Sequence, residues 1–391
     1  MKLYEAIQLT HLEHIEDLPI TDGVDGIKAS IQFLKDNVDI LKGHGNAEVF
    51  RKVDGSPSLV FGINPENGKY FVATKSLFNK VPKINYTPED IDTNRESGVK
   101  DTLKIALEYL PLLGEKGIIQ GDVLFTSDML KTETIDGVKY TTFRPNTITY
   151  AVPYDSALAK TIRQAKIGVA WHTTYHGTKI ENISASFKID IKHKKHVSVY
   201  STTTKLPVSL EALFSPKEYE EIMSKISEVE SEASKFKETD FDIITKYKVD
   251  ILAYINSFVR KGESVSSGMV RGLFDYIEKK YQKAIDSVKT DKSKEAKKVE
   301  LESIKTEIRS IAGTLWYVFL YHQKIQDIKT IIIRKLDLIK TLDTFVLTTD
   351  GYKVTTPEGY VVVDKLTGGA VKLVDRLEFS TNNFNILKTW S

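Results

Sequence analysis

The stretch VFRKVDGSPSLVFG, residues 49–62, contains residue types that could act on a phosphate. Apolar residues on both sides predict two strands, with Lys52, Asp54 and Gly55 where one strand leads into the next. A surface turn with an ion pair would contain the same residues, and this short motif alone favours that simpler interpretation. A nucleophilic lysine would also need a neighbouring carboxylate and a glycine that lets the backbone approach a phosphate closely.

Three more polar residues lie on or beside predicted strands. They are Asp122 in IIQGDVLF, Glu358 in EGYVVVD and Lys372 in GAVKLVDR. Together with Lys52 and Asp54 they make a set of two lysines and three carboxylates, which the strands could bring to one cleft. Those are the groups needed to attack the α-phosphate of a nucleotide, hold a magnesium ion and stabilise the developing charge.

This chemistry requires a lysine that has lost its proton. A free lysine has a pKa of about 10.4, so only about one in a few thousand is neutral at pH 7. A second cation close by lowers that pKa, and Lys372 is the natural neighbour of Lys52. Magnesium prefers oxygen ligands, which makes Glu358 and Asp122 the candidate metal ligands.

The periodicity of the apolar residues predicts the elements that must position this set. Residues 1–46 are predicted to form an N-terminal helical segment packed on the core, because apolar residues recur at helical spacing before Gly43. Residues 47–205 and 343–391 have mainly strand patterns, interrupted by short helices such as DTLKIALEYLPLLG. We therefore predict an α+β domain with a mainly antiparallel sheet.

Residues 206–342 are predicted to form a large all-α insertion in that domain. One helix begins with Ser215 and has Glu218 three residues later, the pattern of a capping box. A long helix is predicted from 297 to 325. Residues 289–298 have no apolar face, so we predict a solvated helix end or a hinge there.

Composition excludes several classes of protein. Of the 391 residues, 41% are hydrophobic, enough for a sizeable core, and the net charge is only +2, so any basic surface must be local. The absence of cysteine excludes disulfides and cysteine nucleophiles. The N-terminus lacks the apolar core of a signal peptide and no apolar run would span a membrane, so we expect a cytoplasmic protein, in the host cytoplasm if a phage encodes it. We also expect a monomer.

The motif KVDG resembles the K-x-D-G motif of the covalent nucleotidyltransferases, which include ATP-dependent DNA ligases, RNA ligases and mRNA-capping guanylyltransferases. QGDVLF, EGYVVVD and AVKLV resemble the third, fourth and fifth motifs of that superfamily, in the same order. The EGYV form is similar to that of RNA-repair ligases of large tailed phages. The resemblance implies a nucleotidyltransferase (ligase adenylation) domain in which Lys52 forms a phosphoamide with the nucleotide.

The resemblance also implies a set of nucleotide-binding residues: Asp54, Gly55, Lys75, Asp122, Tyr150, Glu358 and Arg376. Lys75, in ATKSLFNK, would contact the substrate phosphate, and Tyr150, in TITYAVP, would stack on the base. The sequence departs from the superfamily at two positions. The third motif usually ends in glutamate rather than Asp122, and Val374 replaces the second lysine of the fifth motif, where Arg376 could supply the missing charge.

We therefore expect an ATP-dependent RNA ligase that uses Mg²⁺ and joins the 5′-phosphate and 3′-hydroxyl ends of a polynucleotide. RNA is favoured over DNA by the EGYV form and because only 19 residues follow Lys372, too few for the OB-fold of DNA ligases. The alternatives are a DNA nick-sealing ligase, a guanylyltransferase that uses GTP, and a non-catalytic nucleic-acid-binding or virion-associated protein. The chain also resembles an uncharacterised group of tailed-phage proteins sharing VDG, ATKS, FNK and VKLVDR.

Several residues also have simpler structural interpretations. Tyr150 could be a core aromatic residue, Asp122 could end a strand, and Lys75 is typical of a charged strand end. His172 and His176, in WHTTYHG, could form a metal-binding pair, but without a third ligand we interpret them as hydrogen-bonded polar residues.

Overall fold

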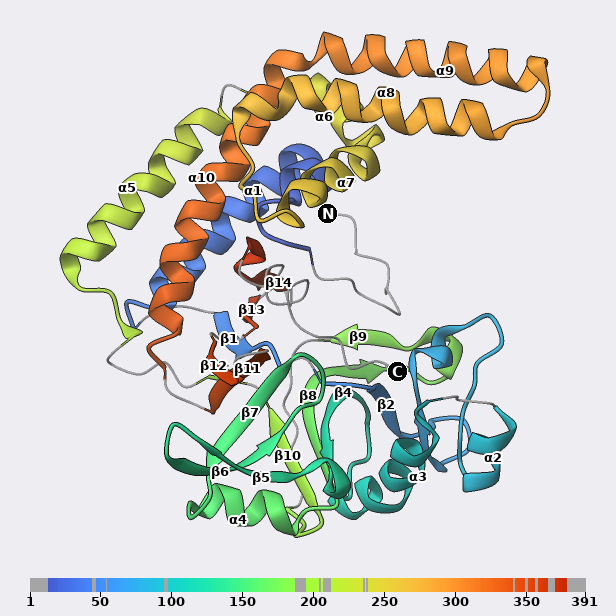
Figure 1. Ribbon diagram of the computed structural model, residues 1–391, viewed down its shortest axis with the longest axis vertical. Helices are drawn as coiled ribbons and strands as arrows, with labels where there is room; N and C mark the ends of the chain where they lie inside the picture. The colour runs from blue at the N-terminus through green and yellow to red at the C-terminus, as the bar shows by residue number, and fades with distance from the viewer. Residues whose placement is uncertain are drawn as a thin grey trace.

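The computed structural model describes residues 13–43, 47–53, 55–94, 98–186, 195–203, 205–206, 212–234, 236, 238–339, 342–348, 351–355, 358–364 and 370–377. They form three β-sheets and a helical region, which confirms the predicted α+β class. The helical region lies on one side of the molecule and the two larger sheets lie on the other, with the smallest sheet between them (Figure 1). In the part of the chain that the structure describes, no helix is long and apolar enough to cross a membrane.

The largest sheet has six strands in the order β10-β8-β4-β2-β3, with β9 paired to β8. Its strands are β2 (Ser58–Ile63), β3 (Tyr70–Ala73), β4 (Ile118–Thr126), β8 (Ile167–His176), β9 (Ser184–Ser186) and β10 (Val199–Thr203). All pairs are antiparallel except β10 with β8, so the sheet is mixed. Every residue of the central strand β4 is buried except Asp122, which is half-buried. The candidate carboxylate is therefore the one position of β4 that solvent reaches appreciably.

The other two sheets are antiparallel and combine strands from both ends of the sequence. The five-stranded sheet has the order β12-β11-β7-β6-β5 and the three-stranded sheet has the order β1-β13-β14. Their strands are β5 (Lys131–Ile135), β6 (Val138–Phe143), β7 (Ile148–Pro153), β11 (Asp343–Thr348), β12 (Gly351–Val354), β1 (Ala47–Arg51), β13 (Tyr360–Asp364) and β14 (Ala370–Leu373). In each of them, a strand that precedes residue 206 pairs with a strand that follows residue 342.

Short helices cover the larger sheets. They are α2 (Pro88–Thr93), α3 (Lys100–Tyr109) and α4 (Ala157–Gln164), with 3₁₀ helices η1 (Lys75–Phe78), η2 (Leu110–Leu113), η3 (Ser127–Met129) and η4 (Ile180–Asn182). The segment DTLKIALEYLPLLG forms α3 and η2, as its pattern predicts, and its apolar side packs in one buried cluster with Phe61 and Trp171 of the six-stranded sheet. That packing leaves the opposite face of the sheet, with Asp122, for the candidate site.

The helical region contains α1 (Leu18–Ile40), which has a kink at Gly23, and six later helices. These are α5 (Pro216–Ala233), α6 (Glu238–Lys246), α7 (Lys248–Val259), α8 (Val270–Ser287), α9 (Asp291–Ser310) and α10 (Ala312–Leu336), with the 3₁₀ helix η6 (Ser267–Met269). All seven share one hydrophobic cluster, which also includes Tyr360 and Leu373 of the three-stranded sheet. The Ser215–Glu218 capping box at the start of α5 is confirmed.

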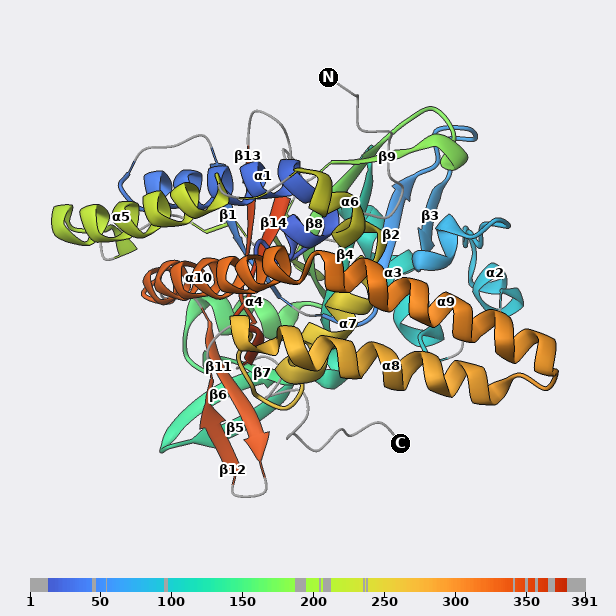
Figure 2. The same cartoon turned by 90° about the horizontal axis from the view of Figure 1, so that it is seen from above.

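The predicted helix from 297 to 325 is wrong in its bounds, because two helices occupy this segment. Helix α9 ends at Ser310, and α10 begins at Ala312 after the buried Ile311, whose backbone leaves the helical conformation. α9 pairs with α8 as a hairpin that projects from the region, whereas α10 runs through the core of the region (Figure 2). A single helix could not follow both paths. Residues 291–298, whose pattern indicated a helix end or a hinge, form the first two turns of α9.

Candidate active site

Lys52 and Glu358 meet where β1 ends and β13 begins. The two strands pair with Arg51 opposite Tyr360, and the backbone N–H of Lys52 donates to the carbonyl of Gly359 at 2.8 Å. This register brings Lys52 Nζ to 3.1 Å from Glu358 Oε2. The carboxylate side chain is 2% exposed and the lysine side chain 25%. The predicted nucleophile is therefore held by a buried carboxylate while part of its side chain stays accessible.

Lys372 lies on the neighbouring strand β14, opposite Val361 of β13. Its backbone N–H donates to the carbonyl of Glu13 at 3.2 Å, so the N-terminal segment covers this edge of the sheet. Burial lowers the pKa of Lys372, and the positive charge of Lys52 lowers it further. The two predicted lysines are thus close enough for each to feel the charge of the other.

The loop after Lys52 connects the three-stranded sheet to the six-stranded sheet. Ser56 N–H donates to the carbonyl of Val123 at 2.9 Å, and Val123 N–H donates to the carbonyl of Pro57 at 3.0 Å. Gly55 packs so tightly there that a Cβ atom would lie 2.5 Å from the Val123 carbonyl oxygen and 2.8 Å from Asp122 Cβ. Only glycine fits, and the loop brings Asp122 beside the segment that carries Lys52. Asp54, the other predicted carboxylate of the loop, lies outside the described residues.

A β-bulge places His172 beside Asp122. Gln120 pairs with Thr173 but Gly121 pairs with Trp171, so His172 is the extra residue of β8. Its Nε2 lies 3.5 Å from Asp122 Oδ1, and its Nδ1 lies 2.8 Å from Thr173 Oγ1. Bulges are frequent next to active sites because they redirect a side chain. Sequence reasoning considered His172 only as a partner of His176, and no sequence signal indicated the bulge.

Lys75 lies at the same end of the six-stranded sheet as Asp122. Ser58 pairs with Asp122, and Val60 pairs with Ala73, so the chain that leaves β3 passes Ser58 as it reaches Lys75. Lys75 is exposed and begins η1, whose first turn is capped by the side chain of Thr74. A cation at this position can reach into the space in front of the sheet.

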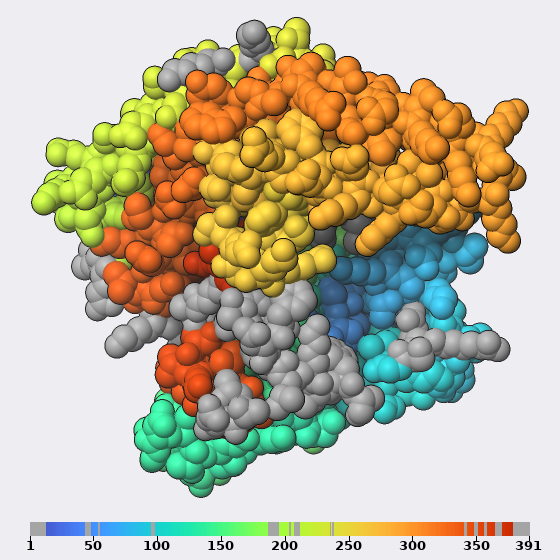
Figure 3. All heavy atoms as spheres, turned by 45° about the horizontal axis from the view of Figure 1, so that its top comes forward, coloured from blue at the N-terminus to red at the C-terminus, as the bar shows by residue number. Residues whose placement is uncertain are grey.

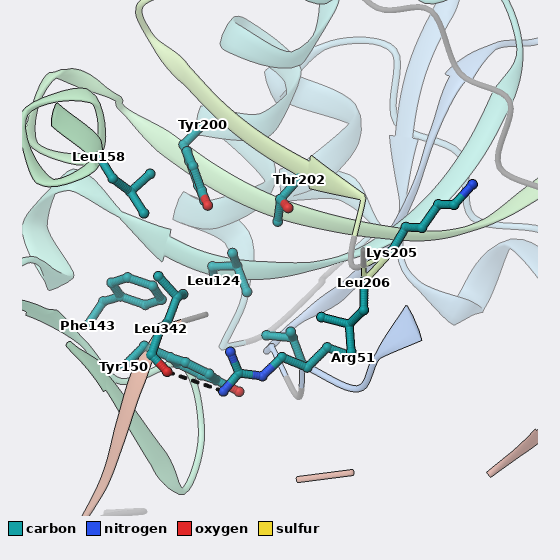
Figure 4. Close-up of a pocket in the computed structure, with 11 residues that line it drawn as sticks. Arg51, Leu124, Phe143, Tyr150, Leu158, Tyr200, Thr202, Lys205, Leu206 and Leu342 are labelled. Atoms are coloured by element: carbon teal, nitrogen blue, oxygen red, sulfur yellow. Dashed lines mark hydrogen bonds between the residues drawn. The ribbon is translucent and has the colours of Figure 1, made fainter. Parts of the chain in front are cut away.

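Tyr150 lies in β7 and lines a cavity of about 260 Å³ between the two larger sheets (Figure 4). Its ring is 1% exposed and stacks on Phe143, with centroids 5.4 Å apart. The cavity is bounded by side chains from several elements: Arg51, Val53, Leu124, Phe143, Tyr150, Leu158, Tyr200, Thr202, Lys205, Leu206 and Leu342. Its volume is near the lower end of the range for small-molecule sites, about 300 Å³. Arg51 and Val53 precede and follow Lys52 in the chain, but Lys52 itself is not among the residues that line the cavity.

Arg376 lies in a buried ionic cluster beside Lys372. Its guanidinium donates to both carboxylate oxygens of Asp17, at 2.9 and 3.1 Å, and to Asn256 Oδ1 at 2.6 Å. The cluster also holds the fully buried pair of Lys329 and Glu16, whose Nζ and Oε1 atoms are 2.5 Å apart. These residues join the start of α1 to α7, α10 and the end of β14. The charge of Arg376 still contributes to the lowered pKa of Lys372.

The candidate metal ligands are therefore on two different sheets, Glu358 beside β13 and Asp122 on β4. Among the described residues, no group of three or more histidine, aspartate and glutamate side chains is arranged to hold a metal ion. Magnesium commonly uses only one or two protein carboxylates and takes its other ligands from water and substrate phosphates. Glu358 and Asp122 would each supply carboxylate oxygens, the type of ligand that this mode of binding uses.

Fold and site together define an α+β protein in which two lysines and two carboxylates gather where a small sheet meets a larger one. The chain belongs to a family of unknown function, DUF6267, whose model matches residues 9–388. No curated protein and no solved structure matches the chain.

Proposed function

We propose that the protein is a covalent nucleotidyltransferase that acts as an ATP-dependent polynucleotide ligase, with Lys52 as the nucleophile. The observation that supports this most strongly is the ion pair of Lys52 and Glu358 at 3.1 Å, with Lys372 on the adjacent strand. The three residues come from segments that resemble the first, fourth and fifth motifs of the ligase superfamily. An isolated surface ion pair would require neither the burial of Glu358 nor a second lysine beside the first.

The reaction begins when the unprotonated Nζ of Lys52 attacks the α-phosphorus of ATP. A phosphorus–nitrogen bond forms, the bond between the α-phosphorus and the bridging oxygen breaks, and pyrophosphate leaves. The 5′-phosphate of a polynucleotide then attacks the same phosphorus and releases Lys52, which gives a 5′–5′ pyrophosphate link. Attack by the 3′-hydroxyl of the second end on the 5′-phosphate joins the ends and releases AMP.

Each neighbouring residue has a role in this proposal. Lys372 favours the unprotonated form of Lys52 and neutralises the α-phosphate. Asp122, with His172 against it, would hold the ribose, and Lys75 would contact a phosphate. Glu358 and Asp122 would also hold Mg²⁺, which when bound neutralises charge on the phosphates of ATP.

The cavity beside Arg51 and Val53 supports a nucleotide as the substrate. Its aromatic lining, with Tyr150, Phe143 and Tyr200, is suited to a planar base, since aromatic side chains stack on bases. ATP is proposed over GTP, and RNA over DNA, from the resemblance of EGYV to phage RNA ligases. We also propose that the protein acts as a monomer.

The test is incubation of the protein with α-labelled ATP or GTP and magnesium, followed by a denaturing gel. We expect label on the wild-type protein with ATP, and none on Lys52→Ala or Lys52→Arg. The Lys52→Arg variant keeps a cation beside Glu358, so its loss of label cannot be attributed to a lost ion pair. Label from GTP would indicate a capping-type enzyme. No label from nucleotide-free, folded protein would reject the covalent mechanism.

A further inference from the structure

The far end of the α8–α9 hairpin is strongly basic. Residues 279–298, which we call the hairpin tip, contain eight lysines and three acidic residues, a net charge of +5, whereas the whole chain has a net charge of +2. The rest of the chain is therefore net negative. The hairpin tip is one local basic segment of the kind that a nucleic-acid-binding protein of low net charge would need.

The lysines of the hairpin tip face solvent. Those with exposed side chains are Lys279, Lys280, Lys283, Lys289, Lys292 and Lys298. Lys280 pairs with Asp250 of α7, and Lys298 pairs with Glu295 at 3.7 Å. Among the described residues, only these two lysines of the tip form ion pairs. Most of the positive charge of the tip is therefore available to an external anion.

The hairpin tip projects from the helical region. The hairpin is anchored at the inner end of the tip, where Lys280 and Tyr281 both donate to Asp250 of α7, Tyr281 Oη at 3.1 Å from Asp250 Oδ2. Beyond this contact it extends past the other helices, on the same side of the molecule as α2 and the β2–β3 hairpin (Figures 1 and 2). In the space-filling view the orange end of the hairpin protrudes above the blue and cyan part of the chain, which holds β2, β3, α2 and α3 (Figure 3). The tip therefore lies on the side of the molecule that carries α2 and the β2–β3 hairpin.

We infer that the hairpin tip binds the phosphate backbone of the polynucleotide whose end reacts at Lys52. This inference rests on the proposed function for the identity of the polynucleotide, RNA, and extends it to a surface outside the site. A group of exposed lysines on a helical hairpin suits a repeated phosphate backbone, because point charges contact phosphates without reading sequence. The contact holds the strand and contributes nothing to the chemistry of the lysyl-AMP.

The test compares two triple variants in binding of a labelled single-stranded RNA 20-mer at several salt concentrations. The tip variant is Lys283→Gln, Lys289→Gln and Lys292→Gln. The control variant is Lys28→Gln, Lys217→Gln and Lys225→Gln, which removes the same charge from exposed positions of α1 and α5. We expect the tip variant to bind about tenfold more weakly, and its logarithmic salt dependence to be shallower by about 2, since each lost contact to a single strand accounts for about 0.7.

The control variant should bind like the wild type, and both variants should form the labelled lysyl-AMP at the wild-type rate. Equal weakening of the two variants would mean that only net charge matters and would overturn the inference. Unchanged binding by the tip variant, or no binding of RNA by the wild type, would overturn it as well. Tip-dependent RNA binding without any lysyl-AMP would reject the proposed ligase activity and leave the hairpin tip as an RNA-binding surface.

Discussion

Lys52 Nζ lies 3.1 Å from Glu358 Oε2, although 306 residues separate the two in sequence. The contact depends on the pairing of β1 with β13, and Glu358 is almost completely buried beside it. A carboxylate is expensive to bury unless a partner compensates its charge, and Lys52 is that partner. The pair therefore fixes the position of the lysine nitrogen before any nucleotide arrives.

Replacement of Glu358 should separate a catalytic role from a structural one. Glu358→Gln keeps the size of the side chain but removes the charge that, in the proposed mechanism, helps to hold Mg²⁺, so we expect lysyl-AMP formation to fall by about a hundredfold or more. The melting temperature should change little compared with Glu358→Ala, which also removes packing. Rates of labelled-adduct formation and thermal unfolding give both quantities. A Glu358→Gln protein that reacts at the wild-type rate would show that the pair only stabilises the fold.

Gly55 should not tolerate a side chain. In Gly55→Ala the new Cβ would collide with the carbonyl of Val123 and with Asp122, so the loop that carries Lys52 must shift. We expect a loss of about 1–3 kcal/mol in the free energy of unfolding and a large loss of lysyl-AMP formation. Gly313→Ala is the matched control, because its Cβ would meet no atom within 4 Å. Urea denaturation and the label assay on both variants check the prediction, and equal behaviour of the two would contradict it.

The Arg376–Asp17 contact should be a major source of stability. Arg376→Met leaves Asp17 buried with His322, 3.0 Å away, as its remaining hydrogen-bond partner among the described residues, and removal of one member of a buried ion pair costs about 3–5 kcal/mol. Arg376→Lys should restore part of this, since lysine keeps the charge but not the two-pronged geometry. Lys104→Met, which breaks the exposed pair with Asp92, should cost at most about 1 kcal/mol. Similar urea midpoints for Arg376→Met and Lys104→Met would refute the assignment.

Acid should unfold the protein through the same cluster. Burial lowers the pKa of His14 from 6.5 to about 3, so the folded state resists its protonation. Burial would raise the pKa of Glu16, but Lys329, His14 and Arg376 lower it from 4.5 to about 2. Both groups are less readily protonated when folded, so their stabilisation is complete at neutral pH and is lost as the pH falls. The loss should begin below about pH 6.5 and steepen below about pH 4.5.

The measurement is the urea midpoint at several pH values between about pH 8 and about pH 3, which spans these pKa values. His14→Gln should flatten the curve above about pH 4.5, where Glu16 does not yet contribute. An unchanged slope in His14→Gln between about pH 6.5 and 4.5 would show that other groups cause the loss.

Local patterns predicted most of the elements but not their partners. The capping box of Ser215 and Glu218 and the valine-rich strand β13 depend on neighbouring residues, so the sequence indicated them directly. The pairing of β1 with β13 is a contact across the whole chain, for which the sequence contains no local signal. The resemblance to a known set of motifs, rather than periodicity, indicated that Lys52, Glu358 and Lys372 belong together.

The burial of two charged residues near the N-terminus also could not be predicted from the local sequence. Glu16 and Asp17 stand in an acidic, amphipathic segment, which by itself is typical of a solvated surface. They are 1% and 4% exposed, because Lys329 and Arg376 arrive from remote parts of the chain to neutralise them. The bulge that turns His172 towards Asp122 could not be predicted from the sequence either, since it depends on the register between two strands.

The distance along the chain between Lys52 and its partners also sets an order of events during synthesis. A ribosome adds about 5–20 residues per second, so the 306 residues from Lys52 to Glu358 take roughly 15–60 s to make. During that time the nascent chain carries the lysine without the strands β13 and β14. The proposed nucleophile is thus among the first parts of the protein to emerge, and its surroundings are among the last to be completed.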